Sequence, residues 1–225
     1  GLGDVYKRQE YRRKVGGFNV GSLLGFVTGG LIYGGFGYNG IGLGGFTYDG
    51  AKRGYIDRDG NIVIDSRNDK VWPMTWYGTV IKNDGKTGFV NRKGEYVIRP
   101  GDYDVGDLDE INGLLVLKEG KTGKSGIFSV ETGQQVIPFR YDGITFAGSD
   151  RLVVEKNGVR SLYNMRTGYS VFSVSTDMTI DPFLHDRLTW VHQGSSNYEV
   201  INDQGQILFA DKEGLIEEAR PFSHG

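Results

Sequence analysis

Five stretches of the chain repeat one pattern: GYIDRDGNIVI (54–64), GFVNRKGEYVI (88–98), GIFSVETGQQVI (126–137), SLYNMRTGYSVF (161–172) and EVINDQGQILF (199–209). Each reads as a strand, a tight turn that contains glycine, and a second strand. The turn glycines are Gly60, Gly94, Gly133, Gly168 and Gly205, at intervals of 34, 39, 35 and 37 residues. Such a period predicts a repeat architecture, which builds extended surfaces and serves binding more often than catalysis.

A further strand is predicted before each of the last four hairpins, at TVIK (79–82), LLVLK (114–118), RLVVEK (151–156) and RLTWVH (187–192). Several of these runs are continuously apolar, which favours burial on both faces. Turns are predicted at Asn83-Asp84-Gly85, Gly120-Lys121, Asn157-Gly158 and Asp59-Gly60.

These patterns predict an all-β fold of tandem antiparallel β-meander repeats, each with three strands and about 35 residues. Whether the array closes like a propeller or runs as an open superhelix depends on the total number of repeats. Helix is favoured only weakly, around 212–220.

The chain divides by composition into three parts. Residues 1–9 (GLGDVYKRQ) are expected to be an artefact, because Asp4–Gln9 back-translates to a string that resembles a sequencing-adapter end. Residues 10–49 form a glycine-rich segment, uncharged from Gly16 to Tyr48. Residues 50–225 hold the repeats, and RPFSHG (220–225) resembles the start of another, so we expect a fragment that is truncated at its C-terminus.

The glycine-rich segment allows three interpretations. Gly21, Gly25 and Gly29 form GxxxGxxxG among apolar residues, which suits close packing of membrane helices. The basic residues of 12–14 precede it, as on a cytoplasmic flank. So many glycines disfavour a helix and leave two other interpretations, a β-segment or loop packed on the first repeat, or a linker. Membrane association through 16–48 therefore stays open.

Four longer stretches carry a family resemblance: AKRGYIDRDGNIVI, GKTGFVNRKGEYVI, VIPFRYDGITF and INGLLVLKEGKTGKSGIF. They resemble the WG-repeat (KWG-type) proteins of bacteria over residues 50–225. The tryptophan that names the family is replaced by Arg53, Thr87 and Ser125 in the clearest units. The resemblance implies an all-β module of a bacterial protein, used for interaction rather than catalysis, and it names no ligand. The location stays open, with the membrane or the cell envelope among the alternatives.

Composition argues against several functions. The net charge is −2, from 26 basic and 28 acidic residues, which gives no electrostatic footprint for nucleic acid. Without cysteine there is no thiol nucleophile or iron–sulfur cluster. KTGKSG (121–126) lacks the first glycine of a phosphate-binding loop, and GFGYNG (35–40) precedes no plausible helix.

No metal-binding or catalytic motif is complete in the sequence. Asp57, Asp59 and Asn61 have the spacing of calcium ligands, but Ile62 stands where the EF-hand pattern needs glycine. The acidic stretch fails the same test; its residues are Asp102, Asp104, Asp107, Asp109 and Glu110. His185 and His192 are seven apart and would face opposite sides of one strand. We therefore expect no catalytic residue, metal or cofactor.

The sequence predicts a non-catalytic scaffold for protein–protein interaction. Trp72, Trp76 and Tyr77 are the candidate partner-binding residues, because tryptophan and tyrosine are enriched at binding hot spots. Packing between repeats is the competing explanation for these three side chains. The alternative functions are a carbohydrate- or small-ligand-binding module and, less favoured, an enzyme with unrecognised carboxylates.

Overall fold

The computed structural model describes residues 9–14, 51–56, 62–148, 150–183, 187–220 and 222, and every regular element within them is a β-strand. The first strands are β1 (Gln9–Lys14), β2 (Ala51–Ile56), β3 (Ile62–Asn68), β4 (Lys70–Val71), β5 (Gly78–Asn83), β6 (Lys86–Asn91) and β7 (Tyr96–Gly101). Then come β8 (Tyr103–Asp109), β9 (Leu114–Glu119), β10 (Ser125–Ser129), β11 (Gln135–Tyr141), β12 (Gly143–Phe146) and β13 (Arg151–Lys156). The last are β14 (Val159–Asn164), β15 (Ser170–Ser175), β16 (Thr179–Ile180), β17 (Leu188–Gln193), β18 (Ser196–Asn202) and β19 (Ile207–Ala210).

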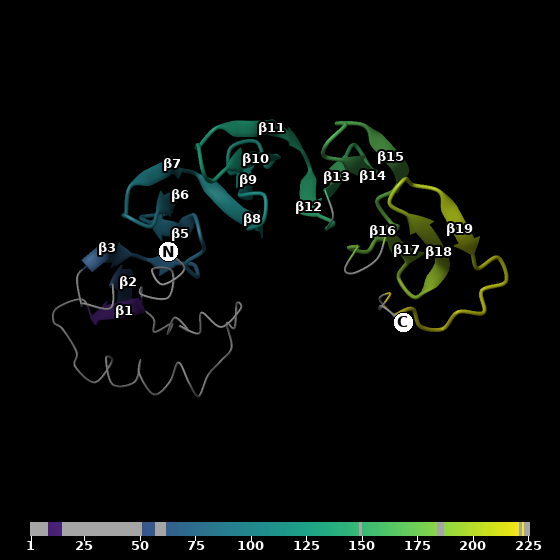
Figure 1. Cartoon of the computed structure of the whole chain (residues 1–225), viewed down its shortest axis with the longest axis horizontal. Helices are drawn as coiled ribbons and strands as arrows, with labels where there is room; N and C mark the ends of the chain where they lie inside the picture. The colour runs from purple at the N-terminus through teal and green to yellow at the C-terminus, as the bar shows by residue number, and fades with distance from the viewer. Residues whose placement is uncertain are drawn as a thin grey trace. The chain divides into compact units, whose positions relative to one another are not determined.

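These strands form five antiparallel sheets in chain order (Figure 1). The first has three strands, β1-β2-β3, and the others have four: β4-β5-β6-β7, β8-β9-β10-β11, β12-β13-β14-β15 and β16-β17-β18-β19. Hydrogen-bonded neighbours are always consecutive in sequence, so each sheet is a meander. This confirms the predicted class of tandem antiparallel β-meander repeats.

Each four-stranded sheet holds one strand more than the predicted three-stranded meander. The added first strand is short in two sheets, where β4 pairs only through Lys70 and Val71 and β16 only through Thr179 and Ile180. Two-residue pairings are too short to give a periodic pattern in the sequence. The helix weakly favoured at 212–220 is wrong, because these residues form no regular secondary structure.

The predicted buried runs are central strands. β5, β9 and β13 are each buried over at least three consecutive residues, which confirms the prediction of burial on both faces. β17 alternates buried and half-buried residues instead.

The cores lie between successive sheets. Contacts divide the chain into two compact units, 1–105 with 110–115 and 128–136, and 106–109 with 116–127 and 137–225. The first unit has a core between β1-β2-β3 and β4-β5-β6-β7, made of Tyr55, Ile64, Val71, Met74, Ile81 and Val90. The second has one between β12-β13-β14-β15 and β16-β17-β18-β19, made of Ala147, Val153, Leu162, Ile180, Phe183, Val191 and Ile201.

Two predicted hairpin tips are confirmed. Asn157-Gly158 and Asp84-Gly85 are two-residue turns, and all four residues have positive φ, as a type I′ turn requires. The turn predicted at Gly120-Lys121 extends to residue 124, and Gly123 takes the positive φ. Asp59-Gly60 lies outside the described residues.

Only parts of the N-terminal 50 residues are described. Gln9, the end of the expected artefact, lies in β1 with residues 10–14, and β1 pairs with β2 from Gln9↔Ile56 to Lys14↔Ala51. The GxxxGxxxG motif and the rest of 16–48 lie outside the described residues. Among those that are described, no helix is long and apolar enough to cross a membrane.

Candidate interaction surface

At one end of each four-stranded sheet lie the loop between the first two strands and the turn after the third strand. In three of these sheets, the residue after the third strand donates its backbone N–H to a carbonyl of that loop. This bond recurs as Val130 N to Gly113 O (2.8 Å), Met165 N to Asp150 O (2.8 Å) and Asp203 N to Arg187 O (2.9 Å). We call this end of a sheet the loop end. In these three sheets the bond fixes the loop to its own sheet, which gives the side chains of the loop a rigid base.

Trp76 and Tyr77 lie in a tight loop-end turn before β5. Thr75 donates its backbone N–H to Gly78 O at 2.7 Å, and its hydroxyl donates to the same oxygen at 2.8 Å. Gly78 N returns a bond to Thr75 Oγ1 at 3.2 Å. The turn leaves the side chain of Trp76 50% exposed. Trp76 is therefore an apolar group presented to solvent on a fixed backbone.

Trp72 lies just before this turn and has a different environment. Its backbone N–H donates to Val80 O (3.0 Å), and its carbonyl accepts bonds from the hydroxyls of Tyr55 (2.5 Å) and Thr79 (2.6 Å). The ammonium of Lys70 lies 4.1 Å from the centre of its half-buried ring. Trp72 thus ties its loop to the preceding strand β2 and to its own sheet.

Tyr77 reaches the loop end of the following sheet. A Cβ placed on Gly113 would lie 3.0 Å from Cζ of the Tyr77 ring, so a larger residue there would require the ring to shift slightly. Gly113 ends the turn that carries Ile111, which is 90% exposed. The loops of two neighbouring sheets therefore meet through Tyr77 and Gly113, and each loop carries an exposed apolar side chain, Trp76 in one and Ile111 in the other.

Lysine–aspartate clips join successive sheets. Lys52 in β2 donates to Asp69, which precedes β4, and Asp69 also accepts the backbone N–H of Asp84 in the β5–β6 turn at 2.7 Å. Lys124 before β10 donates in the same way to Asp142, which accepts the backbone N–H of Asn157 at 2.9 Å.

The clips change the acidity of their groups. The hydrogen bond from Lys52 lowers the pKa of Asp69, and the bond from Lys124 lowers the pKa of Asp142. In each carboxylate the turn N–H lowers the pKa further, because it also binds the charged form. The same bond raises the pKa of Lys52.

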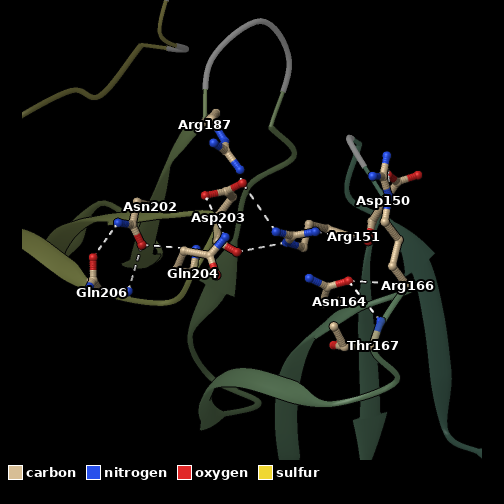
Figure 2. A network of polar contacts seen from close by, with 10 residues as sticks. All are labelled: Asp150, Arg151, Asn164, Arg166, Thr167, Arg187, Asn202, Asp203, Gln204 and Gln206. Carbon is tan, nitrogen blue, oxygen red and sulfur yellow. Dashed lines mark hydrogen bonds and ion pairs between the residues drawn. The ribbon is translucent and has the colours of Figure 1, made fainter.

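A buried arginine makes a second type of link, at the loop ends of the last two sheets (Figure 2). Arg151 starts β13 and donates through Nε to Asp203 O at 2.8 Å and through its terminal nitrogen to Asp203 Oδ2 at 3.2 Å. Exposed Arg187 binds the same Oδ2 through Nε at 2.7 Å. Arg151 and Asp203 are both almost fully buried, so each neutralises a charge that would be costly alone.

The predicted turn glycines that are described adopt positive φ: 84° at Gly94, 74° at Gly133, 72° at Gly168 and 77° at Gly205. Three of them also meet the outer strand of the preceding sheet. A Cβ at Gly94, Gly133 or Gly205 would overlap a backbone carbonyl oxygen, that of Val63, Val97 or Val171 respectively. A Cβ at Gly168 would meet nothing within 4 Å. The first three positions therefore need glycine for close approach as well as for the turn.

The residues considered for metal binding or catalysis do not form a cluster in the part that is described. There, no group of three or more histidine or acidic residues could hold a metal ion. His192 stacks on Tyr198 at 5.5 Å between ring centres, and its Nε2 lies 3.3 Å from Asp181. The acidic residues lie just before β8, in β8 and in the turn after it. In that turn, burial raises the pKa of Glu110. Asp57, Asp59, Asn61, Gly60, His185 and 35–40 lie outside the described residues.

Arg151 and Asp203 were not predicted from the sequence. The sequence does hold a signal for the arginine, because Asp150-Arg151-Leu152 and Asp186-Arg187-Leu188 repeat one motif at the second strand of successive sheets. The partner of Arg151 is 52 residues away, in a turn, and short motifs carry no information about such a pairing.

Two segments, 54–75 and 131–159, match the family model of the WG containing repeat. The repeat resemblance expected from the sequence is therefore confirmed in these segments. No curated protein matches the chain by sequence.

Three solved structures that the chain matches have low sequence identity to it. A eukaryotic initiation factor is 15% identical with a TM-score of 0.52, over 76% of this chain and 50% of that one. BamB from Moraxella catarrhalis is 16% identical with a TM-score of 0.37, over 71% and 57%. Kluyveromyces lactis Hsv2p is 11% identical with a TM-score of 0.43, over 72% and 58%. The chain thus spans between half and three fifths of these proteins, and the likeness to the first concerns the fold alone.

Proposed function

We propose that this protein with WG repeats is a non-catalytic scaffold, which binds another protein through loop ends of neighbouring sheets. The observation that carries the proposal is the half-exposed Trp76 on its hydrogen-bonded turn, whose neighbour Tyr77 meets Gly113 in the loop that carries the exposed Ile111. Large apolar side chains on a rigid base lose little conformational entropy on binding, so they suit a binding hot spot.

The use of charged residues supports a structural rather than a catalytic role for them. Lys52, Asp69, Lys124 and Asp142 bind one another and the turns of the next sheets. Asp203 is engaged by two arginines at once. Groups committed to such contacts are poor proton donors or nucleophiles, because chemistry would break the links between sheets.

The test is retention of a protein from a native extract by immobilised wild-type chain and by two variants. Trp76→Ala should reduce retention by about tenfold, as expected for loss of a hot-spot residue that contributes about 1.4 kcal/mol. Tyr96→Ala is the matched control, since Tyr96 is equally exposed but lies in β7 rather than in the turn that carries Trp76. This control should retain the partner as the wild type does.

A broad hydrolase screen of the same preparation tests the non-catalytic part. Turnover that a single carboxylate or histidine substitution removes would contradict the proposal. Retention of glycans alone, lost in Trp76→Ala, would instead establish the ligand-binding alternative.

A further inference from the structure

The outer strands of four sheets share a β-bulge at the same position of the repeat. In β3 the register passes from Ile64 opposite Tyr55 to Ile62 opposite Ile56, which leaves Val63 as the extra residue. The same shift leaves Val97 extra in β7, Val171 in β15 and Leu208 in β19. Each extra residue follows its turn glycine by three positions, so these bulges belong to the repeat.

Within the chain, a turn glycine is the group that meets such a bulge. Gly94 lies against the carbonyl of Val63, Gly133 against that of Val97, and Gly205 against that of Val171. In every case the glycine has positive φ and comes from the sheet that follows the bulge. The contact places the turn glycine beside the carbonyl oxygen of the bulge residue, and it covers the edge of the bulged strand.

The bulge of β19 is open to solvent. Ile207, Leu208 and Phe209 are 53%, 57% and 47% exposed. The residue after the bulge shows the contrast, because Ile64 and Ile98 are 5% and 4% exposed whereas Phe209 is half exposed. β19 is also the edge strand of its sheet. An apolar, bulged edge strand is a surface that proteins normally cover.

We propose that β19 is a docking site for a further β-meander whose turn has glycine at positive φ, seated on the carbonyl of Leu208. The partner is defined by the three internal contacts, which are the same interface already formed by Gly94, Gly133 and Gly205. A larger residue in that turn would overlap the bulge, so glycine is the specificity-determining feature. This inference does not depend on the surface around Trp76.

The test supplies such a meander by joining a second copy of residues 187–225 after Gly225 of the full chain. In this extension, 222–225 takes the place that 183–186 holds before β17, so the sheet-to-sheet spacing continues. Amide hydrogen exchange at Ile207–Phe209 should slow by about tenfold or more on extension. With Gly205→Val in the added copy only, the slowing should disappear.

Two further variants keep the result interpretable. Leu208→Asp in the original copy should abolish the slowing without lowering the melting temperature of the unextended chain, because that side chain is exposed there. Leu215→Asp, an equally drastic change at another exposed apolar residue, should leave it intact. Unchanged exchange on extension, or equal slowing with glycine and valine, overturns the proposal. So does protection of β19 in the unextended chain that rises with concentration, since a second copy would then be the occupant.

Discussion

Two buried threonines in the same sheet differ in whether their hydroxyl group has a hydrogen-bond partner. Thr79 in β5 is fully buried and donates to Trp72 O at 2.6 Å. Thr87 in β6 is equally buried, but its hydroxyl has no hydrogen-bond partner among the described residues.

Replacing each threonine by valine should therefore have opposite effects. Thr87→Val removes an unpaired hydroxyl and should stabilise the protein by up to about 1 kcal/mol. Thr79→Val removes a satisfied hydroxyl and leaves Trp72 O with one donor fewer, so it should destabilise by about 1 kcal/mol. Urea denaturation of the two variants and the wild type measures both. The reverse order would show that the hydroxyl of Thr87 is bonded.

Turn glycines offer a second matched pair. Gly168 and Gly205 have nearly the same φ, so alanine at either position costs about 1 kcal/mol of backbone strain. Only at Gly205 would the new Cβ also overlap Val171 O. Gly205→Ala should therefore destabilise by at least about 1 kcal/mol more than Gly168→Ala. Equal denaturation midpoints would contradict the close approach of that turn to β15.

Among links between elements, the buried arginine should matter most. Arg151→Met removes the buried cation from Asp203 and leaves the exposed Arg187 to balance its charge, so it should cost about 3 kcal/mol. Arg187→Met removes the exposed partner of the same carboxylate and should cost less than about 1 kcal/mol. Thermal denaturation can compare them directly, and similar losses would show that the buried bond does not hold these sheets together.

The lysine–aspartate clips predict how stability depends on pH. The folded-state pKa of Asp69 and of Asp142 lies below the usual 3.8, so each clip stabilises the fold above about pH 4. That contribution is lost as the pH falls through the folded-state pKa. Asp69→Asn and Asp142→Asn should therefore lower the melting temperature at pH 7, and their difference from wild type should shrink as the pH falls below about 4. Asp104→Asn, at an exposed carboxylate in β8, serves as the control.

The sequence predicted the elements better than the links between them. The positions of the hairpins and buried central strands follow from local signals, such as Asn157-Gly158 and the run RLVVEK. The short strand β4, the bulges and the pairing of Arg151 with Asp203 depend on contacts between residues far apart in sequence, which such signals do not encode. Trp72, Trp76 and Tyr77 stay a prediction as binding residues, and the approach of Tyr77 to Gly113 could be found only from the fold.

At the scale of the whole molecule, repetition places similar loops at the same end of successive sheets. The contact of Tyr77 with Gly113 is where two such loop ends join in the first compact unit. A partner that binds there would touch residues from more than one sheet, which a pocket within a single repeat would not provide. This spread over neighbouring sheets is the central claim about function.

Hydrogen exchange of the chain with and without the protein it retains from native extract tests that claim most directly. We expect the partner to slow exchange in two separate segments, around Trp76–Tyr77 and around Ile111–Gly113, and we expect both effects to be lost in Trp76→Ala. Slowing confined to one sheet, or slowing at both segments that persists in Trp76→Ala, would contradict it.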